Sequence, residues 1–126
     1  MNLKYFTLSE FNCPCGKEEC KGDKMNKDFL EMLDDARDIA SIPFKINSGM
    51  RCRKHNEDLK KRGFKASSKS SHLKGLAADI SAKDSSTRWT IINSLLLAGF
   101  TRLGIASTFI HVDLDSDKQQ EVIWTY

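Results

Sequence analysis

The sequence predicts an α+β fold with three helices and a small, mostly antiparallel sheet. Segments with helical periodicity alternate with short apolar runs, in the order helix, strand, helix, strand, helix and then several strands. The chain has 126 residues, a usual length for one domain and enough to bury a core without disulfide bonds. No internal repeat or interdomain linker is visible, so we expect a single domain over residues 1–126.

Periodicity and capping signals predict the first two helices. Residues 25–41 form the first, and Asn26 is its expected N-cap. Its apolar face consists of Phe29, Leu33, Ala36 and Ala40. A second helix follows Cys52 and stops at Gly63, because glycine is favoured just after a helix end. The polar residues 63–71 then predict a loop.

The segment 85–100 gives the clearest helical pattern in the chain. A serine is the expected cap at its start, and Gly99 suits its end. Three large apolar side chains of this segment share one face, namely Trp89, Ile92 and Leu96.

Short apolar runs bounded by polar or turn residues predict the strands. These runs are 44–48, 76–82, 102–106, 108–115 and 121–126. The second run reads as a buried strand, the third and fourth as a hairpin, and the last as an edge strand.

Composition excludes two classes of partner. The 20 basic and 17 acidic residues give a net charge of +3 and are interspersed, whereas a nucleic-acid-binding domain shows a clustered basic stripe. No apolar run approaches the roughly 18 residues of a membrane helix, and the N-terminal residues lack the pattern of a signal peptide. We therefore expect a monomer made in the cytoplasm, with no nucleic-acid partner and no membrane span.

Two histidines and one aspartate stand at positions typical of metal ligands. His72 lies where the loop meets a strand, Asp79 lies inside an apolar strand, and His111 lies in a later strand. A catalytic zinc commonly has three protein ligands of these types and one open position. The alternative is an ordinary polar role for each residue. That alternative is weakest for Asp79, because a carboxylate in an apolar strand is costly unless it is paired or bound to a metal.

These residues belong to longer motifs that carry a resemblance. Residues 70–80, SSHLKGLAADI, match the pattern S-x-H-x-x-G-x-A-x-D, and NSGMRC upstream and GIASTFIHVD downstream also fit. Together they resemble the zinc D-Ala-D-Ala carboxypeptidase family. This family includes L-alanyl-D-glutamate endolysins of phages and shares its fold with the Hedgehog signalling domain. The likeness runs from about residue 5 to residue 126 and is greatest to the small phage and bacterial branch.

The resemblance implies roles for single residues. His72, Asp79 and His111 would bind zinc, and Gly75 would allow the tight turn between the first two. Arg51 would hold the scissile carbonyl or the substrate carboxylate, since a guanidinium suits both; a structural salt bridge is its alternative. Ser70 would either bind substrate or shape the loop.

The sequence departs from the family pattern at the positions of the general base. Relatives carry an acid three residues before the last ligand or a histidine two residues before it, and Thr108 and Phe109 stand there. Asp113 is the nearest acidic residue, and strand alternation places it on the same face as His111. Asp113 is therefore expected either to act as the base or to orient His111 through a hydrogen bond.

Four cysteines remain outside this set. Cys13, Cys15 and Cys20 are close in sequence, and Cys52 follows Arg51. Thiols this close together in a protein made in the cytosol suggest a second, structural zinc with four cysteine ligands. Two disulfides or free buried thiols are the alternatives.

The function implied by the resemblance is a zinc peptidase that cuts the stem peptides of peptidoglycan, either as a D-Ala-D-Ala carboxypeptidase or as an L-Ala-D-Glu endopeptidase. A phage endolysin would reach the wall after release through a holin-type lesion or as part of the phage particle. The competing reading is a zinc-containing module that binds the cell wall with little or no turnover.

Overall fold

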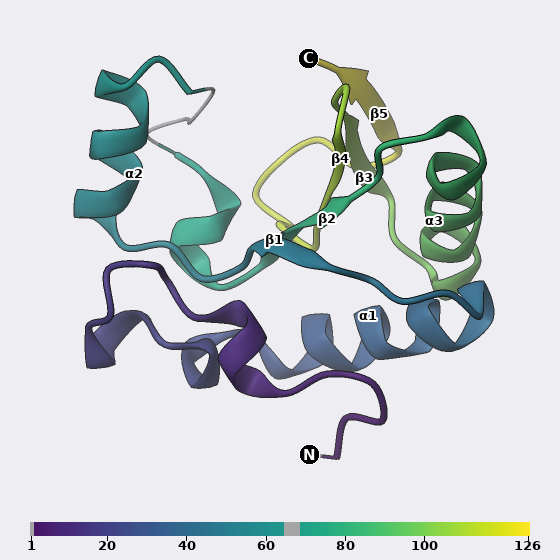
Figure 1. The fold of residues 1–126 in the computed structure, drawn as a ribbon, viewed down its shortest axis with the longest axis horizontal. Helices are drawn as coiled ribbons and strands as arrows, with labels where there is room; N and C mark the ends of the chain where they lie inside the picture. Colours follow the sequence, from purple (N-terminus) through teal and green to yellow (C-terminus); the bar gives the residue numbers. More distant parts are fainter. Residues whose placement is uncertain (1, 65–68) are drawn as a thin grey trace.

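The computed structural model describes residues 2–64 and 69–126. Within them three α-helices and a five-stranded sheet form the fold (Figure 1). The helices are α1 (Lys27–Ala40), α2 (Arg53–Lys61) and α3 (Ser85–Ala98). The strands are β1 (Ile46–Ser48), β2 (Ala77–Ser81), β3 (Arg102–Ile105), β4 (Phe109–Asp113) and β5 (Val122–Thr125). Short 3-10 helices are η1 (Leu8–Phe11), η2 (Glu18–Cys20), η3 (Gly22–Lys24) and η4 (Ser71–Lys74).

The sheet is mostly antiparallel, as predicted. Its strand order is β1-β2-β4-β3-β5, and every neighbouring pair is antiparallel except β3 and β5. The predicted hairpin is confirmed as β3 and β4, and β5 is the expected edge strand. The α+β prediction is therefore confirmed. Of the predicted loop 63–71, residues 65–68 lie outside the described residues, and Ser71 belongs to η4.

The core lies between one face of the sheet and the helices α1 and α3. Phe29 of α1 is fully buried and meets Phe100 edge-on, with ring centroids 5.7 Å apart. From β4, Ile110 and Val112 are fully buried in the same cluster. The N-cap predicted for α1 is confirmed, because Asn26 Oδ1 accepts a hydrogen bond from the Phe29 amide at 2.9 Å.

Two details predicted for α3 are wrong. Its N-cap is Asp84 rather than a serine, because Asp84 Oδ1 accepts from the Thr87 amide at 2.8 Å. The face with Trp89 and Leu96 is also not the buried one, since these side chains are 68% and 46% exposed. The buried residues of α3 are Ile91, Ser94 and Leu95. Apolar residues surround this helix, so periodicity alone does not select the face that packs.

The opposite face of the sheet carries one row of polar and aromatic residues that crosses all five strands. Register pairs Ser48 with Asp79, Asp79 with His111, His111 with Gly104, and Gly104 with Trp124. Glycine is required in this row, because a Cβ at Gly104 would lie 2.6 Å from the Trp124 ring. The sheet thus brings together residues that are far apart in the sequence.

No helix among residues 2–64 and 69–126 combines the length and the apolar character needed to cross a bilayer.

Candidate functional site

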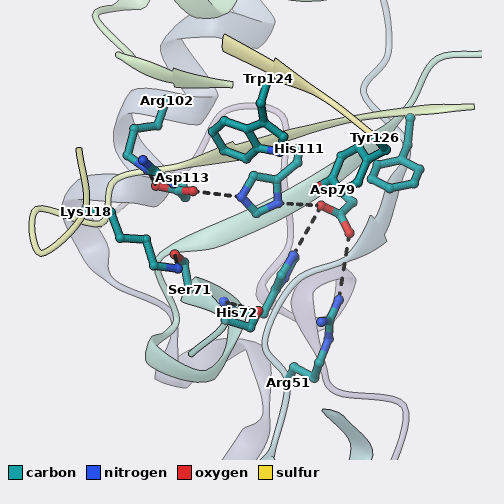
Figure 2. A pocket seen from close by; sticks show the side chains of 12 residues that line it. Arg51, Ser71, His72, Asp79, Arg102, His111, Asp113, Lys118, Trp124 and Tyr126 are labelled. Atoms are coloured by element: carbon teal, nitrogen blue, oxygen red, sulfur yellow. Dashed lines mark hydrogen bonds and ion pairs between the residues drawn. The ribbon is translucent and has the colours of Figure 1, made fainter. Parts of the chain in front are cut away.

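Three potential metal ligands converge at the face of the sheet opposite the core (Figure 2). Asp79 Oδ1 lies 2.9 Å from His111 Nδ1 and 3.2 Å from His72 Nε2. One ligand atom from each residue lies within 4.8 Å of the others. Asp79 and His111 are opposite neighbours on β2 and β4, whereas η4 brings His72 from outside the sheet. The structure therefore assembles all three residues that the sequence motifs single out.

The short helix η4 positions His72. Ser70 Oγ caps η4 by accepting a hydrogen bond from the His72 amide at 3.2 Å. Gly75 ends η4 with φ of +70°, and a Cβ there would lie 2.7 Å from a backbone oxygen, so this turn requires glycine. His72 Nδ1 is 2.8 Å from the carbonyl oxygen of Gly49. Donation from Nδ1 to that carbonyl leaves the lone pair of Nε2 facing the site.

Asp113 holds His111 from the other ring nitrogen. His111 Nε2 lies 2.8 Å from Asp113 Oδ2, so a proton on Nε2 leaves Nδ1 free to bind a metal. The second carboxylate oxygen of Asp113 accepts from Arg102 Nε at 2.7 Å and from the Asp115 amide at 3.1 Å. Asp113 is only 1% exposed. Its carboxylate is thus held by three donors and touches the ring nitrogen that does not face Asp79.

The pKa directions differ between the two histidines of the site and keep Asp79 ionised. Burial is the largest influence on His72 and lowers its pKa, which favours the neutral ring that a ligand needs. Burial opposes ionisation of Asp79, but the two histidines together outweigh it and hold the pKa of Asp79 well below its usual range. Burial also favours neutral His111, yet hydrogen bonds to Asp113 and Asp79 outweigh it and raise the pKa of His111.

The donor set fits zinc. Two imidazole nitrogens and one carboxylate oxygen are common zinc ligands, and each histidine has a hydrogen-bond acceptor on its other nitrogen. Asp79 and Asp113 raise the pKa of His111, and their negative charge would also favour a divalent cation next to His111. Three protein ligands would leave one zinc position open, as in catalytic rather than structural zinc sites.

Arg51 lies beside this centre with its side chain buried. Arg51 Nη1 donates to Asn56 Oδ1 at 3.0 Å, and Nη2 donates to Ser48 Oγ at 3.1 Å. Nη2 also lies 3.8 Å from Asp79 Oδ2. Burial lowers the pKa of Arg51, and the charge of Asp79 opposes this. Within the described part of the chain, Arg51 Nε is buried without a hydrogen-bond partner, and the side chain lines the pocket with Asp79.

A pocket of about 430 Å³ opens over the three ligands, which is a size typical of small-molecule sites. Sequence motifs missed several residues that line it, namely Ser71, Arg102, Lys118, Trp124 and Tyr126. Trp124 lies over His111 with ring centroids 5.5 Å apart, because the row of register pairs places it across Gly104. Alternation in the last strand was the available signal, since it places Trp124 and Tyr126 on one face.

In relatives the general base stands at the positions that Thr108 and Phe109 occupy here, and these two residues have different environments. Thr108 is exposed, and Phe109 packs against Tyr126 with ring centroids 5.5 Å apart. Among the described residues that line the pocket, Asp79 and Asp113 are the only carboxylates. Ser70 also lines the pocket, but its hydroxyl already caps η4.

The four cysteines form a separate cluster. Cys13, Cys15, Cys20 and Cys52 are all free cysteines, and their sulfur atoms lie within 4.8 Å of one another. The cluster joins the segment that contains η2 to the start of α2.

Comparisons with known proteins agree with this geometry. The family model described as peptidase M15 matches residues 4–113. A crystal structure of the L-Ala D-Glu endopeptidase ChiX from Serratia marcescens shares the fold, with a TM-score of 0.62 and 16% sequence identity. That alignment covers 74% of this chain and 82% of the other. No curated protein matches the chain significantly.

The family match spans most of the chain and includes His72, Asp79 and His111. It confirms the resemblance drawn from the motifs around these residues. The chain belongs to the peptidase M15 family.

Proposed function

We propose that the protein is a zinc peptidase that hydrolyses peptide bonds in the stem peptides of peptidoglycan. The observation that carries this proposal is the convergence of His72, Asp79 and His111 in a pocket beside a buried arginine. The substrate class is supported by the motif resemblance and by the fold shared with an L-Ala D-Glu endopeptidase. Both D-Ala-D-Ala carboxypeptidase and L-Ala-D-Glu endopeptidase activity are compatible with this ligand set.

The setting that we propose is that of a phage endolysin. The resemblance to the small phage branch of the family supports it. The protein would then reach the wall after release through a holin-type lesion or as part of the phage particle.

In the mechanism, His72, Asp79 and His111 would hold the zinc, which would supply, when bound, a Lewis acid able to polarise an amide carbonyl and to lower the pKa of water to about 7. The chain's own residues bind and orient the peptide. The guanidinium of Arg51 lines the pocket and would bind an oxygen of the substrate, either the developing oxyanion or a carboxylate. Gly49 and Asp113 keep the two histidine rings in the tautomers that point their lone pairs into the site.

Tyr126 is placed to donate a proton or a hydrogen bond to the reacting peptide. Its ring lines the pocket with Asp79 and Arg51 (Figure 2). Burial and the charge of Asp79 raise the pKa of the Tyr126 phenol, which therefore stays protonated at neutral pH. Tyr126→Phe should lower kcat by roughly 100-fold, the lower end of the range for a positioned donor. Zinc content should stay unchanged.

Steady-state kinetics on a stem peptide, together with metal analysis, would measure this effect. Tyr5→Phe is a matched control, because Tyr5 lies outside the pocket and bonds Asp38. A Tyr126→Phe enzyme with the kcat of the parent would remove this residue from the mechanism.

Asp113 is proposed to orient His111 rather than to act as the base, since three donors hold its carboxylate. Asp113→Asn keeps an oxygen that can accept from His111 but weakens the interaction. We expect zinc affinity to fall by roughly 10- to 100-fold, while kcat at saturating zinc stays within a few-fold of the parent. Chelator competition measures the affinity, and thermal unfolding verifies that the variant is folded. Normal zinc affinity with lost turnover would instead assign the base role to Asp113.

A cell-wall-binding module is the second candidate. It is favoured by the residues at the two usual positions of the base, since neither Thr108 nor Phe109 can accept a proton from water. Incubation of the zinc-loaded protein with purified walls separates the two functions. The peptidase releases new amino groups, and a chelator abolishes the release. Sedimentation with the walls without release of amino groups would favour the module.

A further inference from the structure

The cysteine cluster (Cys13, Cys15, Cys20 and Cys52) lies outside the pocket and is not used by the proposed mechanism. Its sulfur atoms are mutual neighbours rather than two separate pairs. Cys52 Sγ lies 3.9 Å from Cys13 Sγ and 3.7 Å from Cys15 Sγ. Cys15 Sγ in turn lies 2.9 Å from Cys20 Sγ. Cys15 and Cys52 thus each lie close to two partner sulfurs.

These sulfur–sulfur separations suit tetrahedral coordination of a metal ion. Zinc bonded to four sulfurs at about 2.3 Å has sulfur–sulfur edges of about 3.8 Å. Two of the observed separations, 3.9 and 3.7 Å, are close to that edge. The separation of 2.9 Å between Cys15 and Cys20 is shorter. Cys15 is exposed, so its side chain has room to move outward by the difference.

Backbone hydrogen bonds fix the segments that carry the four sulfurs. The Cys13 amide donates to the Cys20 carbonyl at 2.9 Å and closes the loop that carries three of the cysteines. Gly16 turns this loop with φ of +77°. Cys52 is the N-cap of α2, and its sulfur accepts from the His55 amide at 3.3 Å. Amide donors and a helix N-terminus both stabilise the negative charge of a thiolate.

The hollow beside the cluster has a small excess of positive charge, because Glu57 and Asp58 line it together with three lysines. Lys17, Lys54 and Lys61 line the hollow next to Cys15. Four thiolates around Zn²⁺ leave a net charge of −2, which the excess of ammonium groups over carboxylates in this hollow would offset in part. A closed site of four thiolates leaves no open position, so its role is structural.

We propose that the cysteine cluster binds a second zinc ion, which fixes the N-terminal segment to the start of α2. The two segments also meet at Phe11, whose carbonyl accepts from the Met50 amide at 2.8 Å. Figure 1 shows the N-terminal segment, in purple, running beside the start of α2.

The segment held in this way, residues 49–52, serves the pocket directly. Gly49 provides the carbonyl for His72 Nδ1, and the Arg51 amide donates to the His72 carbonyl at 3.1 Å. The second zinc therefore helps to position Arg51 and His72 without touching substrate.

Zinc stoichiometry tests the proposal, and it does so independently of the peptidase activity. The parent protein, purified under reducing conditions and freed of loosely bound metal, should contain two zinc ions per chain. The double variant Cys15→Ser/Cys20→Ser and the single variant Asp79→Asn should each contain one. Pro14→Ala, in the same loop but without a thiol, should keep two. Cobalt substitution should give thiolate-to-metal charge-transfer absorption in Asp79→Asn but not in the cysteine variant.

A mercurial reagent that titrates thiols keeps the test valid if the cysteine variant does not fold. Four equivalents added to the parent should release one of the two zinc ions. In a folded cysteine variant, the Met50 amide should exchange with deuterium faster than in Pro14→Ala. One zinc per chain with four free thiols, or two disulfides with no titratable thiol, would overturn the site. Unchanged exchange at Met50 would overturn its positioning role.

Discussion

Replacement of Asp79 by asparagine should remove the catalytic metal and nearly all activity. Asp79 Oδ1 is the atom shared by both histidines, at 2.9 and 3.2 Å, and its carboxylate is the negative charge of the ligand set. Asparagine is close in shape but is neutral, so it binds a divalent cation far more weakly. Loss of the Lewis acid removes several kcal/mol of transition-state stabilisation, which corresponds to on the order of 1,000-fold in turnover.

Metal analysis and stem-peptide hydrolysis would be measured on the same preparation. Asp84→Asn is the matched control, because Asp84 is the N-cap of α3 and asparagine caps helices equally well. The control should keep both zinc and activity. An Asp79→Asn protein that hydrolyses the peptide at the parent's rate would show that His72, Asp79 and His111 do not form the active centre.

Arg51→Lys should lower kcat/KM by roughly 100-fold, comparable to the loss of one well-placed donor to an oxyanion. Lysine keeps the positive charge but lacks the planar fork that bonds Asn56 and Ser48 at 3.0 and 3.1 Å. It also lacks the Nε donor that is buried in Arg51 without a partner. The three proposed metal ligands are unchanged, so the zinc content of the variant should match that of the parent.

Arg53→Lys controls for the change in side-chain chemistry, because Arg53 is exposed at the first turn of α2. Its kcat/KM should equal that of the parent. If Arg51→Lys also retains full kcat/KM, Arg51 is only a structural partner of Asp79, as the salt-bridge alternative holds.

The three residues that converge as candidate metal ligands could be selected from the sequence because local rules constrain them. Asp79 is a carboxylate in an apolar strand, which needs a partner or a metal, and Gly75 marks a turn that only glycine adopts comfortably. Strand alternation predicts that His111 and Asp113 lie on the same face of the sheet, and the hydrogen bond between their side chains agrees with this. Assignment to zinc rested on the family motifs.

Other parts of the site depend on pairing between distant strands. The register that puts Trp124 over Gly104 and His111 is set by the parallel pairing of β3 with β5. Arg102 reaches Asp113 across the β3–β4 pair. Alternation gives the face of Trp124, but no local pattern encodes the strand pairings that bring Trp124 to His111 and Arg102 to Asp113.

The helix α3 shows a second reason for error. Its sequence is apolar on several sides, and Trp89 and Leu96 are exposed while Ile91 and Leu95 pack. Tertiary contacts with α1 and β4 decide which side of α3 is buried. The buried side can be predicted from the sequence only when the opposite side of the helix is polar. The N-cap of α3 is Asp84 and not the predicted serine. Serine and aspartate both cap helices well, so the residue type alone does not decide between neighbouring positions.

Mass spectrometry of stem peptides digested by the zinc-loaded protein tests the central claim most directly. Purified peptidoglycan fragments would be incubated with the parent protein and, in parallel, with Asp79→Asn. We predict cleavage of one peptide bond type next to D-alanine or D-glutamate by the parent, and none by the variant. Intact stem peptides after prolonged incubation with fully zinc-loaded parent would contradict the assignment as a cell-wall peptidase.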